Sequence, residues 1–152
     1  MTINENELAD ARGAWGNGMI AISKAYEKSG IDDATIVANE MLDQLYGFEF
    51  GPVLFKPTLS GGSQTFRSNK EGALSYFIGG DIKEDNGFAL KPWESIDLVE
   101  VNSIEEDSLI ITMGAFNFKP VNQDVITLVA FTFLLLKDKD SFKIKVHHSS
   151  PV

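Results

Sequence analysis

The fold of this chain is decided near its C-terminal end by residues 125–137, which read VITLVAFTFLLLK. The stretch is rich in β-branched and aromatic residues, which favour strands, and it is too short to cross a bilayer as a helix. Successive side chains on a strand point to opposite faces. Here both faces are apolar, because Leu128, Val129 and Ala130 follow one another without a polar residue. Such a strand has to be covered on both faces.

Three further extended runs surround this strand, near residues 91–102, 108–119 and 142–150. Short polar turns separate the runs, as in an antiparallel meander. In the last run apolar residues alternate with lysines, which is the two-residue period of a half-buried strand. We therefore predict four long antiparallel strands.

The preceding part of the chain has the periodicity of helices. Apolar residues recur at spacings of three and four over residues 6–28, and a second helix is predicted over residues 32–46. Residues 47–68 contain two short extended runs around an SGGS turn, which we interpret as a hairpin. Ser68 and Glu71 form a capping box that predicts a third, short helix.

Helices first and strands last predict an α+β fold in which the helices cover one face of a curved antiparallel sheet. Helices on one side leave the second apolar face of strand 125–137 uncovered. A second copy of the chain is the simplest partner for that face. We therefore expect an obligate homodimer.

The composition narrows the function. The chain has 152 residues, 43% of them hydrophobic, which suits one core and one domain over residues 1–152. Its formal net charge of −9 repels phosphate backbones and anionic lipids, so we expect neither nucleic acid nor membrane as a partner. The absence of cysteine excludes disulfides, thiolate nucleophiles and zinc sites built on cysteine.

The first residues carry no sign of export. They read MTINENELADARGAWG, with neither a cationic segment nor an apolar one, so we expect no signal peptide in this sequence. The compartment stays open. The protein is expected to be soluble, and either cytoplasmic or, if a leader has been removed, periplasmic or organellar.

Strong catalytic motifs are missing from the sequence. The SGGS turn lacks the lysine and helix of a phosphate-binding loop, and the serines near the C-terminus lack the strand-to-helix elbow of a hydrolase. The acidic residues Asp81, Glu84 and Asp85 are interpreted as a solvated loop, with calcium binding as the alternative.

The two histidines of the chain, His147 and His148, are adjacent in the last predicted strand. Adjacent residues on a strand point to opposite faces, so the pair cannot readily share one metal ion. Strict alternation along residues 142–146 predicts that His148 and Ser150 face the interior. His147 and Ser149 would then face the side used for association.

Polar groups set among aromatic residues form the remaining candidate site. Thr58 comes from the predicted hairpin, Tyr76 from the third helix, and His148 and Ser150 from the last strand. The pattern alone favours a structural interpretation, in which His148 is a hydrogen-bonded core residue and Tyr76 packs with its hydroxyl satisfied.

A resemblance favours a functional interpretation instead. The order of elements and the terminal histidine-serine motif resemble the nuclear transport factor 2-like superfamily, which includes the association domain of calcium/calmodulin-dependent protein kinase. More narrowly, the chain is similar to the iota class of carbonic anhydrases over about residues 11–150. The segments that carry this likeness are AWGNGMIAISKAY, YGFEFGPVLFKPT, QTFRSNKEGALSYFIGGD and VHHSS.

The resemblance implies a cone-shaped fold with a pocket between helices and sheet, and reversible hydration of CO₂ to bicarbonate without a metal. No cofactor is expected, with manganese or zinc as the alternative. The hydroxyls would hold CO₂ and water and stabilise charge developing on oxygen, while the histidine would accept the proton directly or indirectly. The implied catalytic residues are Thr58, Tyr76, His148 and Ser150, of which Thr58, Tyr76 and Ser150 would bind substrate.

One departure from the family leaves the register open. In the family a variable residue and then proline follow the HHSS motif, whereas here Pro151 follows Ser150 directly. The alternative register brings His147 and Ser149 to the pocket. Apolar neighbours such as Phe55, Phe66 or Trp93 would keep the pocket dry.

Two other functions remain as alternatives. The first is a non-catalytic association or small-ligand-binding module of the same superfamily. The second is an enzyme like ketosteroid isomerase, which is disfavoured because no carboxylate maps into the proposed pocket to serve as general base.

Overall fold

A computed structural model of the chain describes residues 5–139 and 141–152. The helices are α1 (Glu5–Ser29), α2 (Ile31–Leu45) and α3 (Lys70–Ile78), and the strands are β1 (Leu54–Lys56), β2 (Trp93–Glu106), β3 (Leu109–Pro120), β4 (Thr127–Asp138) and β5 (Ser141–Pro151). Three short 3₁₀ turns are η1 (Phe48–Phe50), η2 (Gly62–Gln64) and η3 (Phe88–Leu90). The predicted α+β order, with helices first and four long strands last, is confirmed.

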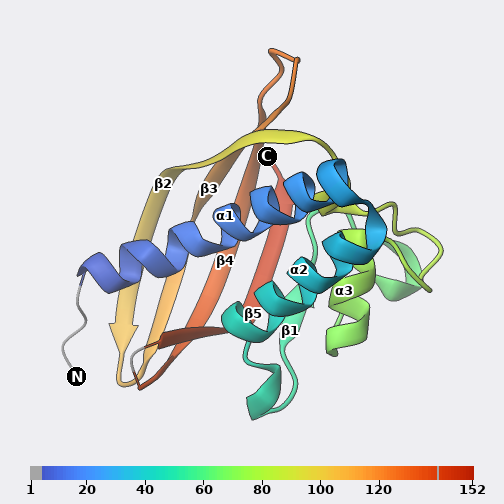
Figure 1. Ribbon diagram of the computed structural model, residues 1–152. Coiled ribbons are helices and arrows are strands. Elements are labelled where there is room, and N and C mark those ends of the chain that lie inside the picture. The colour runs from blue at the N-terminus through green and yellow to red at the C-terminus, as the bar shows by residue number, and fades with distance from the viewer. Residues whose placement is uncertain (1–4, 140) are drawn as a thin grey trace.

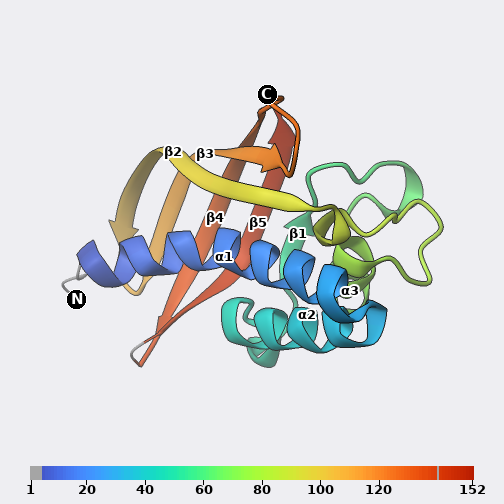
Figure 2. The ribbon, with the colours of Figure 1, turned by 45° about the horizontal axis from the view of Figure 1, so that its top comes forward.

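The strands form one sheet in the order β1-β5-β4-β3-β2. The four long strands pair antiparallel with their sequence neighbours, which confirms the predicted meander. The short strand β1 joins the edge of the sheet parallel to β5. Figures 1 and 2 show α1 running across one face of the curved sheet, with α2 and α3 beside it near β1 and β5.

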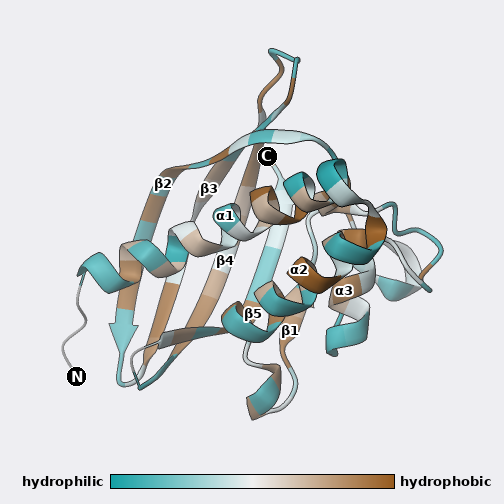
Figure 3. Cartoon of the chain, in the orientation of Figure 1, coloured by the Kyte–Doolittle hydropathy of each residue, from teal (hydrophilic) through white to brown (hydrophobic). Residues whose placement is uncertain are grey.

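The core lies between the helices and the inner face of the sheet. Trp15, Met19 and Ile22 of α1 are buried there at spacings of four and three, as the helical period requires. Gly16 lets α1 approach β2 closely, because a Cβ at this position would lie 3.1 Å from the carbonyl oxygen of Ile96. In Figure 3 the hydrophobic residues follow β3 and β4, whereas β5 is paler and partly hydrophilic. The buried residues of β4 are Val129, Phe131, Phe133 and Leu135.

The predicted hairpin over residues 47–68 is wrong. Only β1 is a strand in this region, and its partner is β5 rather than a neighbouring run. The second run makes a single backbone hydrogen bond back to β1, from the Arg67 N–H to the Phe55 carbonyl at 2.7 Å. Parallel pairing needs no tight turn, so the SGGS segment is free to form a loop that contains η2.

The third helix begins one residue later than the predicted capping box. Asn69 is its N-cap, and the side-chain oxygen of Asn69 accepts a hydrogen bond from the Gly72 N–H at 2.8 Å. Asparagine and serine cap helices by the same chemistry, so the position of the helix hardly changes.

The outer face of the sheet carries exposed apolar side chains. Met113 on β3 is 60% exposed, Leu128 on β4 is 39% exposed, and Ile126, directly before β4, is 53% exposed. The helices therefore cover only one of the two apolar faces of β4, as the sequence predicts.

Candidate active site

Strand β5 changes face at a β-bulge just before the two histidines. In the register with β4, Ile144 lies opposite Leu135. Val146 lies opposite the adjacent residue, Leu134. Lys145 is therefore an extra residue on β5, and a bulge of this kind turns the side chains that follow it to the other face.

The bulge reverses the predicted orientation of the histidines and serines. His147 is 2% exposed and Ser149 is 1% exposed, so both face the interior. His148 is exposed and Ser150 is half-buried. The prediction that His148 and Ser150 face the interior is wrong, and the alternative register, with His147 and Ser149 inward, is the observed one. The catalytic roles of these residues stay predictions.

The inward residues of β5 form a row that leads to a cavity. The row is His147, Ser149 and Pro151, and its partners across the ladder on β4 are Phe133, Phe131 and Val129. Pro151 and Val129 line a cavity of about 490 Å³. Ser149 is the next inward residue along the strand, so it lies directly behind this wall.

The other walls of the cavity come from the loop after β1 and from the segment around η3. Thr58 and Leu59 line it on one side. Phe88, Trp93 and Phe118 give it aromatic surface. This space, called the Thr58 cavity below, is mainly apolar, as small-molecule sites usually are, and its polar lining residues include Thr58, Asn86, Lys91 and Thr127.

Tyr76 lies next to the Thr58 cavity. Its phenol oxygen accepts a hydrogen bond from the Leu59 N–H at 3.0 Å, and its ring stacks on Phe88 with centroids 5.4 Å apart. Burial raises the pKa of Tyr76, and hydrogen bonds with the Leu59 backbone and the Thr58 side chain offset part of that rise. The phenol therefore keeps its proton at neutral pH and is a hydrogen-bond donor. Thr58 and Tyr76 come together as predicted.

Lys56 joins the two sides of the site. Its ammonium group donates to the carbonyl oxygen of Thr58 at 3.2 Å and to that of Ser149 at 3.1 Å. Burial lowers the pKa of this lysine. The contacts hold the end of β1 and the end of β5 together and place a positive charge beside both hydroxyl-bearing residues.

His147 is hydrogen-bonded at both ring nitrogens. Nε2 lies 2.8 Å from the Ser149 hydroxyl, and Nδ1 lies 2.7 Å from the phenol oxygen of Tyr46. The indole N–H of Trp15 donates to the same phenol oxygen at 3.0 Å. A buried imidazole with both nitrogens paired is held in a fixed orientation.

Aromatic rings surround the imidazole. Phe55 stacks on it at 4.8 Å between centroids, and Phe133 meets it edge-on at 4.6 Å. Burial, helped by the charge of neighbouring His148, lowers the pKa of His147 to about 3. His147 is therefore neutral throughout the physiological range.

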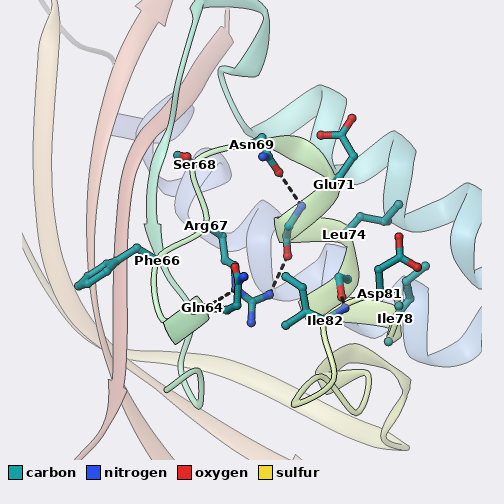
Figure 4. Close-up of a pocket in the computed structure, with 14 residues that line it drawn as sticks. Gln64, Phe66, Arg67, Ser68, Asn69, Glu71, Leu74, Ile78, Asp81 and Ile82 are labelled. Carbon is teal, nitrogen blue, oxygen red and sulfur yellow. Dashed lines mark hydrogen bonds between the residues drawn. The ribbon is translucent and has the colours of Figure 1, made fainter. Parts of the chain in front are cut away.

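A second pocket, of about 510 Å³, lies between the loop before α3 and the helix itself. Figure 4 shows Arg67 pointing between Gln64 and α3, while Phe66 points away from the helix. The Arg67 guanidinium donates to the carbonyl oxygens of Gln64 and Gly72 and pairs with both carboxylate oxygens of Asp85 at 2.8 Å. Since the Arg67 cation is already satisfied, it offers no free positive charge to a ligand, and the other charged residues that line this pocket are the acidic Glu71 and Asp81.

The pairing of Asp85 corrects a prediction. The side chain of Asp85 is only 1% exposed and also accepts a hydrogen bond from Ser75, so the interpretation of Asp85 as solvated is wrong. The Arg67 guanidinium carbon lies 6.0 Å from the centre of the Tyr76 ring. This buried ion pair supports the segment that carries Tyr76.

Tyr46 and Trp15 are site residues that the sequence does not single out. In the sequence, both residues fit the apolar positions of the predicted helices and show no sign of a polar role. Their hydroxyl and indole groups meet His147 only after the chain folds, and Tyr46 and His147 are 101 positions apart in sequence.

Within residues 5–139 and 141–152 no group of three or more histidine, cysteine, aspartate or glutamate side chains is arranged to hold a metal ion. In the same part of the chain, no helix combines the length and apolarity needed to cross a membrane.

The family model described as metal-independent carbonic anhydrase matches residues 6–151. A metal-independent carbonic anhydrase from Nostoc sp. is 40% identical, and the match covers 97% of this chain and 73% of that protein. The crystal structure of a cyanobacterial iota-carbonic anhydrase complexed with bicarbonate has a TM-score of 0.92 at 39% identity, covering 97% of this chain and 92% of that one.

More distant structures share the fold alone. A Xanthomonas campestris protein assigned to the calcium/calmodulin-dependent protein kinase II association domains has a TM-score of 0.62 at 19% identity, covering 99% of this chain and 89% of that one. A Streptomyces avermitilis protein of the NTF2-like family has a TM-score of 0.61 at 15% identity, covering 97% and 94%. These likenesses confirm the NTF2-like fold expected from the order of elements.

Proposed function

The chain belongs to the family of metal-independent carbonic anhydrases, and we propose that it hydrates CO₂ at the Thr58 cavity. The family reaction is the reversible hydration of CO₂ to bicarbonate. The chain is thus an enzyme, and the alternative of a non-catalytic module is set aside. The family description also confirms the expectation of catalysis without a metal cofactor.

Catalysis in this family has to stabilise charge without an ion. Zinc carbonic anhydrases lower the pKa of bound water to about 7, and a metal-independent enzyme lacks that route. The remaining route is to hold water against CO₂ and to give hydrogen bonds to the oxygens that become negative as the new C–O bond forms. Hydroxyl groups with fixed positions suit this role.

The hydroxyls of Thr58, Tyr76 and Ser149 are assigned to that role. Ser149 replaces Ser150 in the assignment, because the bulge at Lys145 turns Ser149 inward. The observation that carries the proposal is the position of Lys56, whose ammonium group binds the backbone carbonyl oxygens of both Thr58 and Ser149 and so holds the two hydroxyl-bearing residues together. Its positive charge adds to the attraction for an anionic product.

The proton released by the attacking water goes to solvent water in this proposal. His148 is exposed, on the face opposite Ser149, so the predicted transfer to His148 inside the pocket is dropped. His147 faces inward, but its pKa of about 3 makes it too weak a base to retain a proton at neutral pH. We assign His147 to orienting Ser149.

The apolar walls suit CO₂, which has no net dipole and gains little from polar surroundings. Trp93 lines the Thr58 cavity, as expected. Phe55 packs edge-on against Tyr76, and Phe66 is 75% exposed. Of the three aromatic residues named from the sequence, Trp93 is thus the one that meets the cavity.

Association through the outer face of the sheet is the second part of the proposal. The exposed apolar residue Met113 lies on β3, Leu128 lies on β4, and Ile126 lies directly before β4. A second copy would cover this face with the same residues, as a two-fold interface does. The Thr58 cavity opens from the other, helix-covered face, so association leaves it accessible.

A matched pair of variants tests the assignment of the site. Ser149→Ala removes an inward hydroxyl, and Ser150→Ala removes the hydroxyl of the next residue, which lies on the other face of the strand. CO₂ hydration should fall by about 10²-fold in Ser149→Ala, as for other lost donors to a developing oxyanion, and stay near wild type in Ser150→Ala. Equal activity of the two variants would contradict the assignment.

A further inference from the structure

Four buried side chains form a continuous line of hydrogen bonds that ends at Ser149, the inward residue of β5 next to Pro151 in the wall of the Thr58 cavity. Trp15 of α1 contacts Tyr46 at 3.0 Å, Tyr46 contacts Nδ1 of His147 at 2.7 Å, and Nε2 of His147 contacts Ser149 at 2.8 Å. All four residues are at most 2% exposed. Because water is excluded, each polar hydrogen in the line has to find its partner within the protein.

Trp15 fixes the direction in which the hydrogen bonds of this line are donated. The indole N–H of Trp15 can only donate, so the Tyr46 oxygen accepts from it. Among the described residues, the remaining partner of the Tyr46 hydroxyl is Nδ1 of His147. The phenol proton therefore points to Nδ1. The opposite arrangement, with a proton on Nδ1, would leave the buried phenol hydrogen unpaired, which is strongly unfavourable.

The state of His147 follows from this direction. A neutral imidazole whose Nδ1 accepts a hydrogen bond carries its proton on Nε2. Nε2–H then donates to the Ser149 oxygen. The stacked ring of Phe55 and the edge-on ring of Phe133 prevent the imidazole from turning over.

We propose that Trp15 and Tyr46 are positioning residues which, through the Nε2–H form of His147, make the Ser149 hydroxyl a hydrogen-bond donor to the substrate. The Ser149 oxygen already accepts from His147, so its own hydrogen is directed to another acceptor. An oxygen of CO₂ or bicarbonate in the Thr58 cavity is such an acceptor, and this step rests on the proposed function. Ser149 then stabilises negative charge and does not act as a nucleophile or a base.

The first test determines which ring nitrogen of His147 carries the proton, and it needs no measurement of activity. The chain has only two histidines, so a ¹⁵N-labelled protein gives two imidazoles in an NMR spectrum, and His148→Gln identifies the signal of His147. We expect His147 to be neutral, with the proton on Nε2 and an unprotonated Nδ1 that accepts a hydrogen bond. A proton on Nδ1 would overturn the proposal, even if the protein proves to be an active carbonic anhydrase at this cavity.

The second test removes the phenol hydroxyl. Tyr46→Phe keeps the ring and deletes the donor to Nδ1, so the Nε2–H form should lose its preference and the Nδ1–H form should appear in the spectrum. Orienting partners of histidines in metal sites contribute about 10- to 100-fold to activity, and we expect a loss of about 10-fold here. The loss should fall on kcat, with KM nearly unchanged, because the donor matters most as charge develops.

The two tests separate the proposal from its premise. A folded Tyr46→Phe protein with the wild-type tautomer and wild-type kcat would overturn the role of Tyr46. If Tyr46→Phe does not fold, the spectrum of the wild-type protein still decides the direction of the line. Loss of activity in Ser149→Ala together with an Nδ1–H His147 would keep the site and remove the positioning role.

Discussion

Phe55 stacks face to face on His147, with ring centroids 4.8 Å apart and 21° between the ring planes. The two residues are also partners in the parallel register of β1 and β5. From this pair both strands run in the same direction, so Thr58 and Ser149, a few residues further on, reach the same end of the sheet. The parallel pairing of a three-residue strand thus brings two distant parts of the sequence to one cavity.

Replacing Tyr76 by phenylalanine should lower activity strongly and leave the fold intact. The change removes one hydroxyl and almost no volume, and the aromatic contacts with Phe55 and Phe88 remain possible. If the hydroxyl stabilises developing charge, kcat should fall by about 10²-fold. A stopped-flow CO₂ hydration assay, with circular dichroism as the control for folding, measures this. Unchanged kcat in the folded variant would reduce Tyr76 to a packing residue.

Activity should survive removal of metal ions. The family is described as metal-independent, and the hydroxyl groups assigned here need no ion to act as donors. CO₂ hydration is measured after exhaustive dialysis against a chelator, with metal content determined by elemental analysis. Activity that disappears with the metal and returns with one equivalent of a divalent ion would rule out the mechanism proposed here.

The free energy of unfolding should rise with pH between the pKa of His147 in the folded protein and its pKa in the unfolded chain. Burial lowers the pKa of His147 from 6.5 to about 3, so between these values the unfolded chain binds a proton that the folded protein does not. One such proton raises the free energy of unfolding by up to about 1.4 kcal/mol per pH unit. The rise ends above the pKa of His147 in the unfolded chain, because His147 is then neutral in both the folded and the unfolded state.

Urea unfolding at about pH 5 and about pH 6.5 measures this dependence in an interval where most carboxylates are already ionised. The titratable neighbours of His147 are Tyr46, which contacts Nδ1, and His148, which follows it in sequence; Lys56 lies opposite His148 in the register of β1 and β5. His147→Gln should show a weaker rise than the wild type. His148→Gln, which changes an exposed histidine, is the matched control and should keep the rise. An equal rise in His147→Gln and wild type would show that His147 is not the source.

The protein in solution should have twice the mass of one chain. Met113, Ile126 and Leu128 are exposed apolar side chains on the outer face of the sheet, and exposed apolar surface of this kind commonly marks an interface between proteins. Light scattering at micromolar concentration should therefore give a mass of twice 16.7 kDa. Met113→Lys places a charge in the middle of this face and should shift the population to monomers. A wild-type mass of 16.7 kDa would exclude the predicted dimer.

Much of the fold follows from local patterns in the sequence. Helix and strand periods depend on neighbouring residues, so the positions of α1 and of the four long strands could be predicted from spacing alone. The partner of β1 could not, because its pairing with β5 joins residues such as Phe55 and His147 that are far apart in sequence. A short extended run followed by glycines is typical of one strand of a hairpin. Its pairing with β5 could be predicted only if the sheet were known to have a free edge there.

The site was predictable to a different extent for each residue. Thr58 and Tyr76 followed from the resemblance to a family and come together as expected. The choice between His147 and His148 depended on the bulge at Lys145, and a lysine with a long aliphatic stem fits either face of a strand. The alternating pattern before it therefore gave no sign of the change in phase.

The HHSS motif contains two overlapping copies of the same pair, a histidine followed by a serine two positions later. His147 with Ser149 is one copy, and His148 with Ser150 is the other. A chain with one residue fewer would lose the bulge and keep the first copy inward, because strict alternation from Ile144 onward would then be restored. A chain with one residue more before the motif would rotate the end of β5 by one position, and the second copy would then face the interior. The bulge can thus absorb the loss of one residue and the second copy can compensate for the gain of one, so the inward histidine and serine are kept in both cases.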